Sequence, residues 1–214
     1  MSRDKAQQSL LPYVPWSTTA WEALWAPYDQ ATYRLVLDQI GPEDIVLEIG
    51  AGDLRLARQM ASIARKVYAL EYNRYLIDRT MKSAGDPLPA RLEVICADAR
   101  SFPIPRGITM GVLLMRHCTY FQGYASKLKA AGCNKLITNA RWHFGVEVVP
   151  LQIRRISYRE LSIGWYACWC GQVGFVPGPA ERLTIRVLEE IHEVIDCPDC
   201  FREPLDVKQE PFGV

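Results

Sequence analysis

The chain lacks any long apolar run and any strong excess of charge of one sign. Its 214 residues carry 25 basic and 24 acidic side chains, so the formal net charge is +1. No apolar stretch approaches the roughly 20 residues that cross a bilayer, and the N-terminus has no signal-peptide core. Composition therefore supports neither a membrane span nor nucleic-acid binding through a basic field over the whole molecule. We expect a cytoplasmic protein.

Internal repeats and low-complexity tracts are also absent, and a hydrophobic content of 49% is enough for one full core with a small appendage. In a cytosolic chain, the seven cysteines are expected to be reduced thiols or metal ligands rather than disulfides. We expect an irregular N-terminal segment over residues 1–18, an α/β domain over 19–155 and a cysteine-rich extension over 156–214. The pattern becomes turn-rich near the last boundary, at about 153–164.

Short apolar runs alternate with helical segments through the middle of the chain. Ahead of them, Ser17-Thr18-Thr19 is expected to cap a helix over about 20–40, whose apolar stripe includes Leu35 and Val36 and which ends at Gly41-Pro42. The alternation predicts an α/β fold with a doubly wound, mostly parallel sheet, whose ligands bind at the carboxyl ends of the strands. The expected strands cover 45–50, 66–72, 91–97, 108–115, 135–139 and 146–152, and the expected helices cover 54–64, 73–84 and 122–131.

A third glycine is missing from the loop that follows the first expected strand. The run 46–52 reads Val-Leu-Glu-Ile-Gly-Ala-Gly, and Asp53, Leu54 and Arg55 follow it. Glycine permits a tight turn and a close approach of the backbone to a ligand. Because a dinucleotide fingerprint needs the third glycine, the loop favours a smaller nucleoside ligand over a pyrophosphate.

Carboxylates close the next two expected strands. Glu71 follows Val67-Tyr68-Ala69-Leu70 and lies about twenty residues beyond the loop, where an acidic side chain accepts hydrogen bonds from both ribose hydroxyls. Asp98 closes the run 92–97 and is placed to accept from the exocyclic amine of adenine. The loop and the two acids together predict a nucleoside cofactor site.

These segments carry a family resemblance. Residues 42–105 resemble class I S-adenosylmethionine (SAM)-dependent methyltransferases, and within that superfamily 46–52, 67–71 and 94–99 are similar to the ribosomal RNA adenine dimethylases. The resemblance implies SAM as cofactor, with Glu48 orienting the loop and the methionine end, Glu71 on the ribose and Asp98 on adenine. The cofactor-binding set that it implies is Glu48, Gly50, Ala51, Gly52, Glu71, Tyr72, Asp98 and Ala99.

The fourth expected strand departs from that family. Base-amine methyltransferases commonly carry an Asn/Asp-Pro-Pro-Tyr-like motif there, whereas this chain has Arg116 and His117. Adenine N6 methylation is therefore not favoured. His117 is a candidate general base, and Arg116 is a candidate for holding a carboxylate or phosphate. Alternatively, Arg116 pairs with an internal acid and His117 bonds to a loop. The end of the fifth strand is comparable, with His143 in the run 139–144.

Four of the seven cysteines form two close pairs near the C-terminus. Cys168 and Cys170, together with Cys197 and Cys200, can supply a tetrahedral Cys₄ site for structural zinc in a small zinc-ribbon-like extension. The alternatives are replacement of one ligand by His192, or four reduced thiols without metal. Four protein ligands leave no open position for catalysis. Cys96, Cys118 and Cys133 read as small buried residues.

The sequence predicts a SAM-dependent methyltransferase, with His117 and Arg116 handling the acceptor. RNA is the first expectation for that acceptor, followed by a protein side chain or a small molecule. Two alternatives stay open: a catalytically silent SAM-binding or scaffold protein, and an enzyme that consumes SAM without transferring methyl. The aromatic residues Tyr13 and Trp16 precede the first strand and are candidates for covering the cofactor or substrate, whereas Trp21 and Trp25 have the spacing of a core-facing helical stripe.

Overall fold

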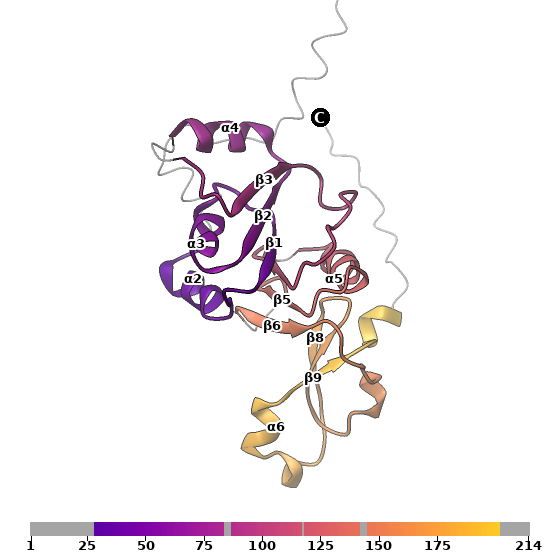
Figure 1. Cartoon of the computed structure of the whole chain (residues 1–214). Helices are drawn as coiled ribbons and strands as arrows, with labels where there is room; N and C mark the ends of the chain where they lie inside the picture. Colours follow the sequence, from indigo (N-terminus) through magenta and orange to yellow (C-terminus); the bar gives the residue numbers. More distant parts are fainter. Residues whose placement is uncertain (1–27, 84–86, 117, 142–144, 202–214) are drawn as a thin grey trace, which may run out of the picture. The chain divides into compact units, whose positions relative to one another are not determined.

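The computed structural model describes residues 28–83, 87–116, 118–141 and 145–201 of the chain (Figure 1). The chain divides into two compact units, Met1–Pro103 and Ile104–Val214. Over the described ranges, none of the helices has the length and apolar character needed to cross a membrane. The predicted division at residues 18 and 155 stays a prediction.

The first unit contains three parallel strands in the spatial order β3-β2-β1. In register, Ile49 lies beside Leu70 and Glu71 lies beside Cys96, so the strands end at one edge. Helix α3 packs on β2 and contacts α2. The elements are α2 (Gln30–Leu37), β1 (Ile45–Ile49), α3 (Arg55–Ile63), β2 (Lys66–Glu71), α4 (Arg74–Ser83) and β3 (Leu92–Cys96).

Burial explains why these segments form strands and helices. Val46 and Leu47 of β1 are fully buried, which is the near-continuous burial expected of a strand covered on both faces. The helix α3 buries a single stripe that includes Ala57 and Met60, whereas its other face is polar.

The prediction of a single helix over 20–40 is wrong within the described residues. Helix α2 begins at Gln30 because Asp29 caps it, its Oδ1 accepting from the backbone N–H of Thr32 at 2.8 Å. The helix ends at Leu37, four residues before Gly41. The predicted stripe is also partly wrong, since Leu35 is 54% exposed. Trp21 and Trp25 lie outside the described residues.

The second unit contains the strands β4, β5 and β6 and a separate small sheet. Strand β5 pairs with β4 in parallel and with β6 antiparallel, and helix α5 separates β4 from β5 in sequence. The small sheet has the order β8-β7-β9, with β7 antiparallel to β8 and parallel to β9. The elements are β4 (Met110–Leu113), α5 (Phe121–Ala130), β5 (Lys135–Thr138), β6 (Glu147–Pro150), η2 (Tyr158–Glu160), β7 (Gly164–Cys168), β8 (Val173–Val176), η3 (Ala180–Arg182), α6 (Ile185–Glu189), β9 (Ile191–Val194) and η4 (Pro198–Phe201).

The predicted α/β fold with a mostly parallel sheet is confirmed. From β1 to β6, each expected strand or helix is present, with boundaries shifted by no more than two residues. The carboxyl ends of β1, β2 and β3 meet at one edge, which is where the sequence predicted that a ligand binds.

Candidate cofactor site and metal-ligand cluster

The loop after β1 crosses the end of β2. Gly50 and Gly52 have φ angles of 76° and 58°, which lie in the left-handed region that favours glycine. The backbone N–H groups of Gly50 and Ala51 both donate to the carbonyl oxygen of Leu70, at 2.8 and 3.0 Å. A Cβ built on Gly52 would meet nothing within 4 Å, so the loop has open space beside it.

Glu71 ties this loop to the end of β2. Its Oε2 accepts from the backbone N–H of Gly52 at 2.9 Å, and its Oε1 accepts from the backbone N–H of Asn73 at 2.8 Å. Each carboxylate oxygen has a second lone pair, so both can still accept a hydroxyl from a ligand. The geometry therefore fits the role on the ribose that the resemblance implied for Glu71.

Glu48 is a buried carboxyl beneath the loop, with 5% of its surface exposed. Burial, followed by the charges of Asp53 and Glu71, raises the pKa of Glu48 well above its usual value. Its Oε2 has no hydrogen-bond partner among the described residues. A buried acceptor of this kind is stabilised by a cationic or hydrogen-bonding ligand, which fits the proposed contact with the methionine end of SAM.

Asp98 is held by a neighbour that sequence reasoning missed. The guanidinium of Arg100 donates to both carboxylate oxygens, from Nε to Oδ1 at 3.1 Å and from Nη2 to Oδ2 at 2.7 Å. The backbone N–H of Arg100 adds a bond to Oδ1 at 2.9 Å. The Asp-x-Arg spacing in the sequence is the signal from which this contact could have been predicted. Tyr72, the remaining predicted cofactor residue with a side chain at this edge, is 70% exposed.

The predicted acceptor side lies in the second unit. Arg116 is exposed and follows β4, whereas His117, His143, Tyr13 and Trp16 lie outside the described residues. Asn139, which follows β5, is 7% exposed. Neither its Oδ1 nor its Nδ2 has a hydrogen-bond partner in the described part of the chain. The sequence singled out Asn139 only as a flank of His143, so its buried amide is an addition from the structure.

Charged side chains that the sequence did not single out form a buried cluster close to the end of β5. Arg141 is 2% exposed, and its Nη2 donates to Oε2 of Glu147 and to Oε1 of Glu193, each at 2.6 Å. Arg155 adds a longer bond from Nε to Oε2 of Glu193 at 3.3 Å. Because Glu147 lies on β6 and Glu193 on β9, the cluster joins the small sheet to the rest of the second unit.

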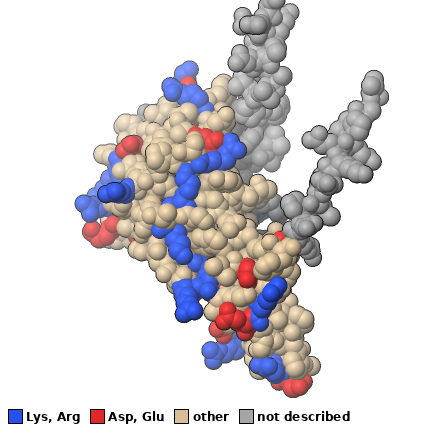
Figure 2. Space-filling model, turned by 90° about the vertical axis from the view of Figure 1, so that its right-hand side faces the viewer, with Lys and Arg blue, Asp and Glu red and all other residues tan. Residues whose placement is uncertain are grey.

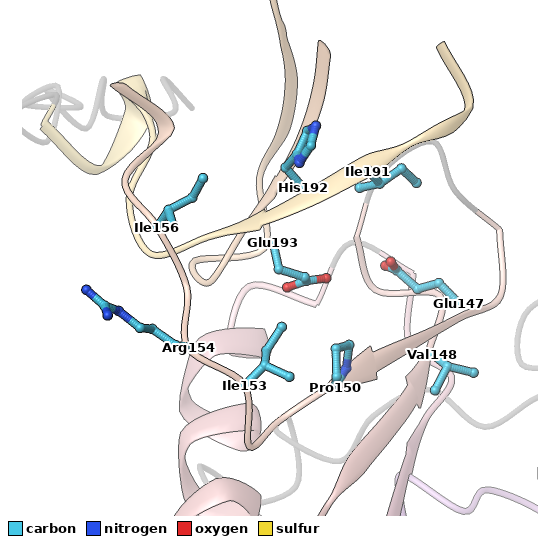
Figure 3. Close-up of a pocket in the computed structure, with 9 residues that line it drawn as sticks. All are labelled: Glu147, Val148, Pro150, Ile153, Arg154, Ile156, Ile191, His192 and Glu193. Carbon is cyan, nitrogen blue, oxygen red and sulfur yellow. The ribbon is translucent and has the colours of Figure 1, made fainter. Parts of the chain in front are cut away.

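An open pocket of about 540 Å³ lies beside this cluster (Figure 3). It is lined by residues of β6, of the 153–156 segment and of β9. Figure 3 shows the side chains of His192 and Glu193 on opposite sides of β9. The two carboxylates in the lining, Glu147 and Glu193, are already bonded to Arg141.

The four predicted metal-ligand cysteines come together. Their Sγ atoms all lie within 4.8 Å of one another, with separations of 3.7 Å for Cys168–Cys200, 3.6 Å for Cys170–Cys197 and 3.7 Å for Cys197–Cys200. These distances are too long for disulfides. They match the edge of about 3.8 Å expected for a tetrahedron with zinc–sulfur bonds of about 2.3 Å. The donor set and its geometry therefore fit zinc, and His192 is not part of this group.

Backbone geometry supports the same cluster. Gly171 has a φ of 101°, and its N–H donates to the carbonyl oxygen of Cys168 at 2.9 Å, which closes the turn after Cys170. A hydrogen bond with the neighbouring thiol of Cys168, helped by the backbone N–H of Gln172, outweighs burial and lowers the pKa of Cys170 to about 5, whereas burial raises the pKa of Cys197 to about 11.

The surface carries charges of both signs, as expected from the nearly equal numbers of basic and acidic residues. Figure 2 shows Lys and Arg side chains in several separate groups on one face, with Asp and Glu interspersed. This distribution gives local basic groups without one positive field over the face.

No family model matches the chain. A 68-residue stretch is 38% identical to the dimethyladenosine transferase of Kluyveromyces lactis, and covers 31% of this chain and 21% of that protein. A 58-residue stretch is 40% identical to an rRNA methyltransferase of Streptomyces thermotolerans, and covers 27% and 18%. The match thus spans about a fifth of the length of these curated relatives.

Solved structures resemble about half of the chain. The 23S rRNA methyltransferase ErmE is 21% identical, with 52% of this chain and 46% of that chain covered and a TM-score of 0.45. A dimethyladenosine transferase from Plasmodium falciparum is 20% identical, with 52% and 42% covered and a TM-score of 0.46. Over the matched stretches the chain is similar in sequence to dimethyladenosine transferases and rRNA methyltransferases, which confirms the resemblance predicted from its glycine loop and acidic strand ends.

Proposed function

We propose that the chain is a SAM-dependent methyltransferase that acts on RNA. The carrying observation is the joint placement of the Gly50–Gly52 loop, Glu71 and the buried Glu48. The loop offers open space for a nucleoside, and the carboxylate of Glu71 keeps lone pairs for the ribose hydroxyls. Glu48 supplies a buried acceptor for the positively charged methionine end.

SAM would supply an electrophilic methyl group bound to a positively charged sulfur. When an acceptor atom attacks this methyl group in line, the sulfur leaves as a neutral thioether. The protein's part is to align the two and to exclude water. Arg116 is exposed, as a group that holds an RNA phosphate needs to be. His117 is the proposed base that takes the acceptor proton.

An RNA acceptor is supported by the relatives, one of which is named an rRNA methyltransferase. The replacement of the Asn-Pro motif by Arg116 and His117 argues for an acceptor atom other than adenine N6. The absence of the Asn-Pro motif after β4 also favours a second candidate, a SAM-binding protein without catalytic activity.

We also propose that Cys168, Cys170, Cys197 and Cys200 bind one structural zinc ion. The support is the set of sulfur separations of 3.6–3.7 Å. Cysteines that bind a metal rather than form disulfides suit a reducing compartment, which is the basis for proposing a cytoplasmic protein.

One experiment tests these assignments together. Native mass spectrometry of the purified chain is expected to show one zinc ion and bound SAM or S-adenosylhomocysteine. Incubation with methyl-labelled SAM and ribosomal RNA is expected to give labelled RNA and S-adenosylhomocysteine. If protein or a small molecule is labelled in place of RNA, the proposed acceptor is wrong and the labelled class of molecule replaces it. Binding without any S-adenosylhomocysteine would favour the silent protein, and methylthioadenosine would indicate a reaction that does not transfer methyl.

A further inference from the structure

Trp169 stands between two of the four clustered cysteines and connects them to other elements. Its backbone N–H donates to the carbonyl oxygen of Val194 on β9 at 2.9 Å. Its Nε1 donates to Oγ of Ser126 on α5 at 3.2 Å. Two cations lie over its ring, with the Arg155 guanidinium 4.2 Å and the Lys129 ammonium 5.5 Å from the ring centroid. The indole therefore holds positive charge at a residue that stands between two of the cysteines in the chain.

Arg155 is the more deeply placed of these cations. Its side chain is 3% exposed. Its Nη2 donates to the carbonyl oxygen of Pro150 at 2.6 Å, and its Nε donates to Glu193. The third nitrogen, Nη1, has no hydrogen-bond partner among the residues that the structure describes. A buried donor on a charged group is costly to leave without an acceptor, so a negatively charged neighbour would stabilise this nitrogen.

The charge balance indicates which neighbour. Within the cluster Arg141 bonds closely to both Glu147 and Glu193, whereas Arg155 reaches only Glu193, over 3.3 Å. Four thiolates around one divalent ion form a centre with net negative charge, which needs compensation when it is buried. Burial lowers the pKa of Arg155 and the charge of Glu193 opposes this, so a further negative group would favour its protonated form; Cys168, next to Trp169 in the chain, is itself fully buried. Arg155 thus lies between the carboxylate of Glu193 and the ring of Trp169, the residue that separates Cys168 from Cys170 in the chain.

We infer that Arg155 is the counter-ion of the thiolate metal centre, with Trp169 as the ring that holds its guanidinium in place. The inference rests on the proposed zinc site and goes beyond it. Arg155 is a positioning residue, since it binds no metal itself. Through Glu193 it also links metal binding to Arg141 and so to the segment after β5.

Metal affinity of three variants tests this assignment. Arg155→Gln removes the charge and keeps a donor for Pro150, so it is expected to fold. Arg155→Lys keeps the charge. Arg154→Gln, at the exposed neighbouring position, is the matched control. Zinc affinity is measured by competition with a chromophoric chelator, and Co²⁺ absorption reports whether four thiolates still bind.

Arg155→Gln is expected to bind zinc about 10- to 100-fold more weakly than the wild type, as loss of an outer partner does at other metal sites. Arg155→Lys is expected to stay within about threefold, and Arg154→Gln to be unchanged. If a variant is only marginally stable, the rise in its melting temperature on adding zinc is measured instead, and it is expected to rank the variants in the same order of zinc affinity. Equal affinity of Arg155→Gln and wild type would overturn the inference, as would a Lys variant as weak as the Gln variant. A wild type that binds no metal would instead overturn the zinc site.

Discussion

The backbone N–H of Gly52 donates to Oε2 of Glu71 over 2.9 Å, which joins the loop after β1 to the acid that closes β2. One side chain thereby fixes the loop and faces the open space beside it. Loss of Glu71 is expected to affect cofactor binding in two ways, through the proposed ribose contact and through the position of the loop.

Glu71→Ala is expected to weaken SAM binding by about 10- to 100-fold, because hydrogen bonds to a charged group contribute roughly 1.5–3 kcal/mol each. Isothermal titration calorimetry measures the change. Glu43→Ala is the control, since Glu43 is exposed and precedes β1 at the opposite end of the strand. Comparable losses in both variants would contradict a specific role for Glu71.

Glu48 is expected to make stability depend on pH. Its folded-state pKa is raised well above the usual value of 4.5, mainly by burial. The folded state therefore keeps a proton that the unfolded state releases above pH 4.5, and the free energy of unfolding falls as pH rises toward the folded-state pKa. Glu48→Gln cannot ionise, so its stability relative to the wild type is expected to increase as the pH rises above 4.5 toward the folded-state pKa of Glu48. Urea unfolding without cofactor checks this, and parallel pH profiles would refute it.

Zinc removal is expected to destabilise the second unit. Cys197→Ser is expected to abolish stoichiometric zinc and to lower the melting temperature, because the thiol is buried and central to the cluster. Cys96→Ser, at an exposed cysteine outside the cluster, is expected to retain one zinc per chain. Metal analysis and thermal denaturation distinguish the two. A full complement of zinc in Cys197→Ser would exclude the proposed ligand set.

Leu54 combines a left-handed backbone with a fully buried side chain. Its φ is 64°, and its exposure is 0%. Leu54→Ala is expected to lower the free energy of unfolding by about 2–5 kcal/mol through the cavity it leaves. Leu54→Gly is expected to be more stable than Leu54→Ala by about 1 kcal/mol, because glycine adopts this φ without strain. Chemical denaturation measures the free energy of unfolding of both variants. A more stable Leu54→Ala than Leu54→Gly would contradict the strain argument.

Arg141 is expected to be a stability residue. Arg141→Met leaves the buried carboxylates of Glu147 and Glu193 short of a partner, which is expected to cost about 3–5 kcal/mol in the free energy of unfolding. Arg186→Met is the control, because its side chain is 87% exposed and pairs with Glu190 on the surface. Its effect is expected to stay within about 0.5 kcal/mol. Similar effects in the two variants would show that the buried cluster contributes little.

The strands, helices and cysteine cluster were predictable because their signals are local. The helix expected over 54–64 is observed as Arg55–Ile63, since its apolar stripe repeats at helical spacing. The pairs Cys168/Cys170 and Cys197/Cys200 carry their ligand spacing in the sequence itself. Contacts that depend on chain folding were not predictable. Arg141 and Glu193 are 52 positions apart, and neither differs in sequence from an exposed charged residue.

The same limit applies to the site. Glu71 and Asp98 follow apolar runs and so could be placed at strand ends, but the clasp of Arg100 on Asp98 depends on the turn after β3. Asn139 follows β5 in the same way, yet only the fold reveals that its amide is buried. The acceptor residues Arg116 and His117 stay predictions.

The pairing of β7 with β9 has a consequence for how the chain selects its alignment during folding. Cys168 lies beside Val194, and Cys197 follows three residues later. Sliding β9 by one residue would displace Cys197 by about 3.3 Å and would turn Glu193 to the other face of the sheet. Four sulfur atoms can then no longer surround one ion. Metal binding would thus stabilise the native register selectively, because only the correctly aligned strands bring all four sulfur atoms around one ion.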